Sequence, residues 1–373
     1  MATRVLKLAS TFGLLVTIIL LWLVYVEIAS FARIWLASRQ IEVIPRSRLQ
    51  TIYKSQDWVN TLADEWGPSN QLNYQAFVGW RRKPFEGRAI RIDQDGLRRT
   101  FHSHCDADAY TIWMFGGSTV WSTGSPDWLT LPSLLGQQYE QAGRKVCIRN
   151  YGEKAWVNTQ ELIKLILELK HTEKKPDLVI FYDGPADVYE TYQSGRAGVH
   201  ENFDEIKRLY EEHVSETNGN FRYLLKTNTA RLFMEQRFMN LVGERASKDA
   251  DSIAQQAVRC YVENLKVVDV LARAYGFDYA VFWEPTIDNG HKPLTPDEET
   301  RRQRAHEQTP GLEKADRTAR ACVDSISPPH FFDIADVFDQ VTDPIYFDWG
   351  HVSAEGNRIV AERMYRTLQQ ARP

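Results

Sequence analysis

Two segments of the chain carry side chains suited to acyl-transfer chemistry. Ser118 follows two glycines in Gly116-Gly117-Ser118-Thr119, and glycines before a serine let the backbone turn sharply and present the hydroxyl. Asp348 stands three residues before His351. A carboxylate so placed can accept the Nδ1–H of the imidazole, which leaves Nε2 free to take a proton from a serine. Together the two segments supply a nucleophile, a base and a group that orients the base.

Two further segments supply candidate groups around an oxyanion. Gly152, in Asn150-Tyr151-Gly152, can offer a backbone N–H, and the segment from Asp183 to Asp187 reads Asp-Gly-Pro-Ala-Asp and is turn-like. Taken alone, each segment has a plainer interpretation. Gly-Gly-Ser-Thr is more often a turn or a phosphate-binding loop, a glycine at a strand end is ordinarily a turn, and a lone Asp-x-x-His is more often a surface pair.

The elements that position these segments alternate from Ala109 onward. The predicted strands are Tyr110–Phe115, Lys145–Arg149, Leu178–Tyr182, Tyr279–Trp283 and Phe331–Ile334, and the predicted helices are Leu131–Ala142, Thr159–Lys170, Ile253–Tyr275 and Ser353–Leu368, with Ser353 as N-cap. This order predicts a three-layer α/β/α sandwich around a mainly five-stranded parallel sheet. Because ligands bind at the carboxyl ends of parallel strands, we expect the four segments to meet at one edge.

In this arrangement the chain resembles the SGNH (GDSL-like) hydrolase family, membrane-anchored bacterial type, over about Ala109–Gln370. The matching stretches are Gly116-Gly117-Ser118, Gly152, Gly184-Pro185-Ala186-Asp187 and Asp348–Gly356, with Trp283-Glu284-Pro285-Thr286, Val78-Gly79-Trp80 and Asp95-Gly96-Leu97-Arg98 similar to the anchored bacterial members. The resemblance implies a flavodoxin-like fold, Ser118 as nucleophile, His351 as base and Asp348 as its orienter. It also implies that the backbone N–H groups of Ser118 and Gly152 donate to the oxyanion.

One position departs from the family pattern. The third block normally reads Gly-x-Asn-Asp, in which the Asn side chain is the third oxyanion donor, whereas this chain has Ala186 there. A methyl group cannot donate a hydrogen bond, and losing one such donor costs about 10²–10³ in rate. Asn158 is a candidate substitute donor. The pattern therefore supports the fold and the Ser–His–Asp set better than it supports full activity.

The resemblance implies a serine esterase that hydrolyses or transfers an acyl ester of a glycan or a lipid at the cell envelope, with no metal or cofactor. The alternative is a catalytically impaired relative that binds glycan or serves as an accessory subunit of a membrane assembly, as Ala186 favours. Nucleotide binding through Gly116-Gly117 lacks a nearby Lys and a fuller glycine motif. Basic residues form short clusters and the net charge is −4, so we expect no nucleic-acid partner.

An N-terminal segment indicates a membrane anchor. Leu8–Val26 has no charged residue, is long enough to span a bilayer, and carries Trp22 and Tyr25 near its end. A cleaved signal peptide is the alternative, with Ser30-Phe31-Ala32 as the cleavage-like site. We expect residues 1–30 to form the anchor, 31–108 a helical stalk and a small β element, and 109–373 the catalytic domain with a helical insertion at 189–250.

The cysteines bear on the compartment. Four are present, and the most economical pairing is Cys105–Cys147 with Cys260–Cys322, while buried free thiols are the plainer alternative. Positive charges flank both ends of the apolar segment, so charge counting does not decide the orientation. We expect the domain on the extracytoplasmic side, where disulfides form.

Overall fold

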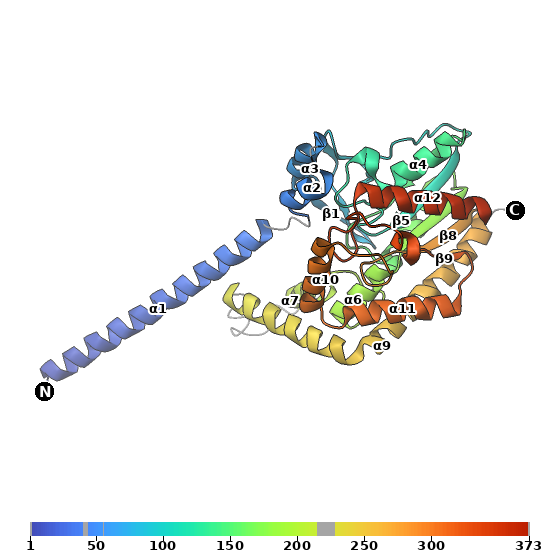
Figure 1. Cartoon of the computed structure of the whole chain (residues 1–373). Helices are drawn as coiled ribbons and strands as arrows, with labels where there is room; N and C mark the ends of the chain where they lie inside the picture. Colours follow the sequence, from blue (N-terminus) through green and yellow to red (C-terminus); the bar gives the residue numbers. More distant parts are fainter. Residues whose placement is uncertain (1, 40–43, 55, 215–227, 372–373) are drawn as a thin grey trace. The chain divides into compact units, whose positions relative to one another are not determined.

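The computed structural model describes residues 2–39, 44–54, 56–214 and 228–371 (Figure 1). The chain divides into two compact units. One comprises residues 1–43 and 207–241, and the other comprises residues 44–206 and 242–373. The candidate site lies entirely in the second unit.

Helix α1 (Ala2–Arg39) belongs to the first unit (Figure 1). Its segment Phe12–Arg33 is long and apolar enough to cross a membrane, and the predicted span Leu8–Val26 lies within the same helix. A signal sequence meets the same requirements of length and composition. Of the predicted insertion, Phe203–Val214 forms α7 as expected. The stretch Phe221–Val242 lies partly outside the described residues, and its described part belongs to α9 (Asn228–Tyr275).

The predicted three-layer sandwich is confirmed. Five parallel strands, in the order β6-β5-β7-β8-β9, form the sheet. They are β5 (Tyr110–Gly116), β6 (Val146–Asn150), β7 (Leu178–Asp183), β8 (Asp278–Trp283) and β9 (Phe331–Asp333). Each lies within two residues of its predicted position, because short, fully apolar runs bounded by turn residues are typical of strands buried on both faces.

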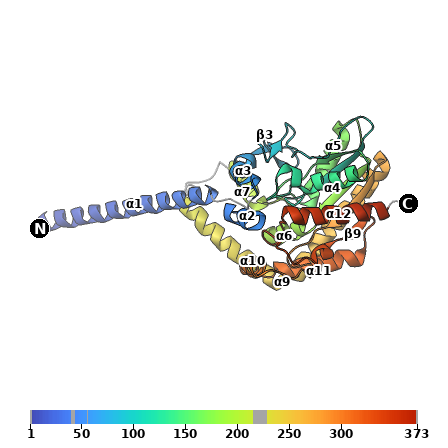
Figure 2. The ribbon, with the colours of Figure 1, turned by 45° about the horizontal axis from the view of Figure 1, so that its top comes forward.

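Both faces of the sheet are covered by helices (Figures 1 and 2). One face packs against α4 (Leu131–Gln141) and α12 (Ala354–Gln370), which lie side by side in both views. The other packs against α5 (Asn158–His171), α6 (Pro185–Ser194), α11 (Leu312–Ile326) and the later part of α9. Each face therefore has its own hydrophobic core: the first lies under α4 and α12, and the second under the helices of the other face. Successive side chains of a strand point to opposite faces, so Ile112 and Met114 belong to the first core while Trp113 and Phe115 belong to the second.

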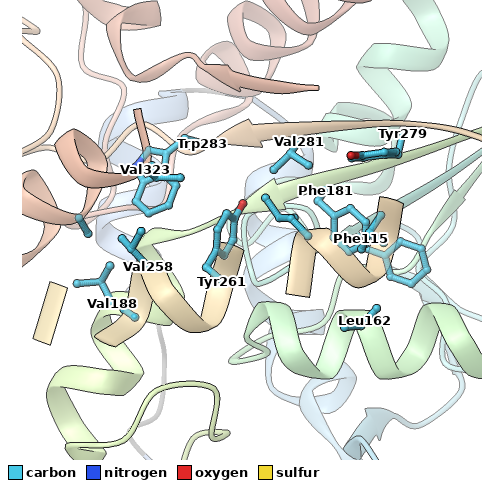
Figure 3. Packing of buried hydrophobic residues seen from close by; sticks show 14 of the residues in the cluster. Phe115, Leu162, Phe181, Val188, Val258, Tyr261, Tyr279, Val281, Trp283 and Val323 are labelled. Atoms are coloured by element: carbon cyan, nitrogen blue, oxygen red, sulfur yellow. The ribbon is translucent and has the colours of Figure 1, made fainter. Parts of the chain in front are cut away.

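Figure 3 shows the second core, in which aromatic rings of the strands meet aliphatic side chains of the helices. Phe181 of β7 stacks on Phe115 of β5, with ring centroids 5.5 Å apart. Tyr261 of α9 meets Trp283 of β8 edge to face. All four rings are almost fully buried, and fully burying a large apolar side chain contributes about 1.5–3 kcal/mol. This core holds β7 and β8 rigidly where they end at the candidate site.

The predicted stalk, residues 31 to about 70, divides between the two units. Helix α1 continues to Arg39, whereas α2 (Arg46–Tyr53) and α3 (Trp58–Trp66) pack within the second unit and bury Leu49, Leu62 and Trp66. The predicted β element follows as two hairpins. They are β1 (Leu72–Gln75) with β2 (Gly79–Arg82), and β3 (Phe85–Glu86) with β4 (Arg91–Ile92). Asp95-Gly96 lies in the turn after β4, as predicted.

Three helices were not predicted: α6, α11 and α10 (Pro296–Gln308), which begins with a Thr295–Glu298 capping box. Helices α2 and α3 fall within the predicted helical stalk, whose division into separate short helices was not predicted. One predicted disulfide is formed. Cys105 and Cys147 are bonded, which ties the segment before β5 to β6. The pair Cys260–Cys322 is not formed, and both are free thiols. Cys260 Sγ lies 3.9 Å from Thr159 Oγ1 of α5, whereas Cys322 lies on α11.

Candidate active site

The Ser118 loop begins where β5 ends. Gly116 has no room for a side chain, because a Cβ there would lie 2.3 Å from the carbonyl oxygen of Tyr182 on β7. The chain then turns, and Ser118 O accepts a hydrogen bond from Thr123 N at 3.0 Å. No regular helix follows Ser118 directly, since residues 119–124 form turns and the next α-helix is α4.

Asp348 and His351 lie on a tight loop before α12. Phe347 N donates to His351 O at 2.8 Å, and Ser353 caps α12 by accepting from Gly356 N. These bonds close the loop and orient the imidazole toward the sheet edge.

The structure brings Ser118, His351 and Asp348 together in hydrogen-bonding sequence. His351 Nε2 lies 2.6 Å from Ser118 Oγ, and His351 Nδ1 lies 2.7 Å from Asp348 Oδ2. The other oxygen of Asp348 accepts the N–H groups of Gly350 and His351. Burial works to raise the pKa of Asp348, but the imidazole and these donors hold that pKa below its ordinary value. The carboxylate is thus kept ionised, as a group that orients a histidine must be.

The expected oxyanion donor Gly152 packs closely against the Ser118 loop, at Val120 and Trp121. A Cβ on Gly152 would lie 2.5 Å from Trp121 N, so only glycine fits there. Its N–H, however, already donates to Asn150 Oδ1 at 2.9 Å. Three residues on, Ala155 has a φ of +61°, a conformation that residues with a Cβ rarely adopt. Within the described parts of the chain, neither the Ala155 N–H nor the Ser118 N–H has a hydrogen-bond acceptor.

Ala186 lies in the first turn of α6, after Gly184 ends β7. Gly184 has a φ of +108°, and a Cβ there would clash with the Trp283 ring. This fixes where the helix starts. Asn158, the suggested substitute donor, is buried, and its Nδ2 donates to Asp183 Oδ2 at 2.7 Å.

A buried set of carboxyl groups lies next to the nucleophile loop. The Thr119 hydroxyl donates to Glu284, which follows β8. Burial raises the pKa of Glu284 well above its ordinary range although Thr119 donates to it, and the nearby Asp183 and Asp187 add to the rise. Burial and Asp183 likewise raise the pKa of Glu161. The direction is the same across the set, because burial disfavours the charged form and neighbouring carboxylates would repel one another.

Two other features of the site escaped sequence reasoning. Trp349, between Asp348 and His351, stacks on Tyr189 of α6 with centroids 5.6 Å apart. Arg48 and Tyr53 of α2 contact the loops of Ser118 and His351, which are distant in sequence: Arg48 donates to Phe347 O, 299 residues away, at 2.7 Å. Tyr53 donates to Gly124 O and accepts from Ala354 N. Trp349 lies inside the quoted motif and was open to prediction, whereas the α2 contacts carry no local pattern.

The comparisons identify similar folds and no family. No protein-family model matches the chain, and no curated protein does. Among solved structures, the chain is similar to an acetyl xylan esterase, with 13% identity, 69% of this chain and 99% of that chain covered, and a TM-score of 0.35. It is similar to a psychrotrophic esterase from Pseudoalteromonas sp., with 12% identity, 70% and 97% covered, and a TM-score of 0.38.

It is also similar to a lipolytic protein of the G-D-S-L family from Veillonella parvula, with 10% identity, 70% and 98% covered, and a TM-score of 0.37. The solved structures thus include esterases and lipolytic proteins of the G-D-S-L type. At these TM-scores, what this chain does has to be inferred from its own site.

Proposed function

We propose that this protein is a membrane-anchored serine hydrolase of acyl esters, with Ser118, His351 and Asp348 as its catalytic triad. The observation that carries the proposal is the continuous relay from Ser118 Oγ through both imidazole nitrogens to Asp348, with contacts of 2.6 and 2.7 Å. Distances of this size allow proton transfer from the hydroxyl to Nε2.

The reaction has two balanced halves. Ser118 Oγ attacks the ester carbonyl while His351 takes the hydroxyl proton, and the tetrahedral intermediate expels the alcohol, which receives that proton. Water then attacks the acyl-serine with His351 as base, which releases the carboxylic acid and restores the serine. A sugar hydroxyl in place of water would make the protein an acyltransferase.

The oxyanion forms beside the Ser118 loop. We propose the Ser118 N–H as one donor, and Gly152 as the second if its bond to Asn150 opens. Ala155, three residues after Gly152, is the alternative, because its N–H has no acceptor within the described residues. Left-handed backbone strain of this kind is often held at functional sites.

The substrate we propose is an O-acylated glycan or lipid at the cell envelope. Phe12–Arg33 would anchor the protein, and the Cys105–Cys147 disulfide supports an oxidising compartment outside the cytoplasm. The second candidate is an impaired hydrolase that binds glycan or a membrane assembly. Ala186 favours it, because the first turn of α6 offers no side-chain donor at that position.

A fluorophosphonate probe separates the two candidates without knowledge of the substrate. It should label the wild-type protein and not Ser118→Ala, and p-nitrophenyl acetate hydrolysis should fall to background in that variant. Ser325→Ala, which changes an exposed serine of α11, is the matched control and should behave as wild type. Equal labelling of wild type and Ser118→Ala would refute the hydrolase and leave the binding protein.

A further inference from the structure

The β1–β2 hairpin presents two aromatic side chains to solvent. Tyr74 is 84% exposed and Phe77 is 77% exposed. The loop between the strands holds Phe77 at a φ of +71°, where a glycine is the usual residue and a bulky side chain is rare. Backbone strain that keeps an aromatic ring in water has no folding benefit, and such outliers point to function.

A polar hollow of about 610 Å³ lies beneath these rings. Its walls combine the hairpin with the outer side of α5, from Lys164 to Thr172, and with Arg149 of β6. Arg149 donates to the Tyr151 hydroxyl through one Nη and has no carboxylate within ion-pair distance among the described residues. Lys164 is paired with Glu168 at 2.6 Å. His171, at the end of α5, is also exposed toward solvent. The hollow thus offers free donors beside aromatic faces.

We propose that this hollow binds an oligosaccharide chain. The C–H face of a pyranose ring packs on an aromatic ring, while its hydroxyl groups bond to charged and amide side chains. Tyr and Trp suit such sites because they combine an apolar face with a polar tip. A membrane-inserting hairpin would instead present a convex apolar tip, and here the rings border a hollow lined by Arg149, Lys164, Glu168 and His171.

The hollow adjoins the candidate active site through one segment. Tyr151 lines it, and Arg81, which also lines it, donates to Tyr151 O at 3.1 Å. The next residue, Gly152, packs against the nucleophile loop. The claim that the substrate is a glycan and not a lipid rests on the proposed hydrolase. The claim that the hollow binds an oligosaccharide does not.

The test is titration calorimetry on full-length Ser118→Ala in matched detergent, with xylohexaose, chitohexaose and hexagalacturonate. We expect at least one to bind. Tyr74→Ala and Phe77→Ala should each weaken it by about two- to tenfold, the range of one lost aromatic stacking contact. Phe77→Gly removes the ring but suits the positive φ, so it should lose affinity without losing stability. The control is Tyr275→Ala, made like the others in the Ser118→Ala protein, which replaces an exposed tyrosine at the end of α9. It should bind the glycan as tightly as Ser118→Ala alone.

The outcomes are distinct. Binding by none of the three glycans, or binding unchanged in Phe77→Gly, would overturn the inference, whatever the esterase assay shows. Binding that depends on both rings, in a protein without Ser118-dependent hydrolysis, would sustain the site and refute the hydrolase. In nanodiscs that carry a gadolinium-chelate lipid, broadening of a fluorine signal from para-fluorophenylalanine at position 77 would assign the hairpin to the membrane instead.

Discussion

Replacing Ala186 with asparagine places a side-chain donor in the first turn of α6, one turn before the contact of Tyr189 with the His351 loop. Ala186 and Tyr189 are one helical turn apart and so share a face of α6, and Tyr189 stacks on Trp349 beside His351. The new amide would therefore project toward the reacting atoms. One oxyanion donor contributes about 10²–10³ in rate, or ~3–4 kcal/mol. We expect Ala186→Asn to raise kcat/KM for p-nitrophenyl acetate by up to that factor.

The matched control is Ala186→Leu, which has a similar size and no donor. It should be no faster than wild type, and both variants should keep fluorophosphonate labelling of Ser118. The increase in kcat/KM should come from a higher kcat and not from a lower KM, because the donor acts on charge that develops only in the transition state. A folded Ala186→Asn with unchanged kcat would contradict this account, and would mean that a backbone N–H such as that of Ala155 already fills the position.

Four further results follow from the structure. Asp348→Asn should lower kcat by about 10⁴ with little change in thermal unfolding, because the imidazole loses its orienting carboxylate; activity within tenfold of wild type would contradict the triad. Burial raises the pKa of Glu190 to about 8 and that of Asp316 to about 7. The folded state then holds protons that the unfolded state releases near pH 4, so the free energy of unfolding should fall as pH rises from 5 to 8. Glu190→Gln should flatten that decline in a thermal-unfolding series, and an unfolding temperature that rises over this range would refute the assignment. Replacing both Cys105 and Cys147 with serine should cost about 4 kcal/mol of stability in the chain-entropy account of a loop of 42 residues, measured by urea unfolding, with Cys260→Ser as the near-neutral control.

The sheet was predictable because its information is local. Each strand is a short apolar run with turn residues at its end, as in Leu178–Asp183 followed by Gly184-Pro185, and parallel order follows from the alternation with helices. That Ser118, Asp348 and His351 lie close together was expected for a related reason, since a segment after a strand and a loop before a covering helix can meet at one edge of the sheet. The spacing in Asp348-x-x-His351 also fixes a local hydrogen bond.

Other parts depend on contacts that no short pattern encodes. The N–H of Gly152 donates to the side-chain Oδ1 of Asn150, two residues earlier in the chain. Cys260 and Cys322 are free thiols, because pairing of cysteines on two separate helices depends on how those helices pack, and Cys260 Sγ lies beside Thr159 Oγ1. The short helices α2 and α3 have too few periodic positions to be distinguished from a stalk, and only tertiary packing of Leu49 and Trp66 reveals their place.

The contacts of Arg48 and Tyr53 with the loops of Ser118 and His351, called here the α2 clasp, limit how far the protein can be shortened from its N-terminus. Arg48 holds the loop of His351, and Tyr53 joins the loop of Ser118 to the start of α12. Burial raises the pKa of Tyr53 to about 12, so its hydroxyl keeps its proton for that bond at any physiological pH. A soluble form cleaved before Ile44 would retain the clasp, whereas one trimmed to Ala109 would release both loops at once and lose the alignment of serine and imidazole.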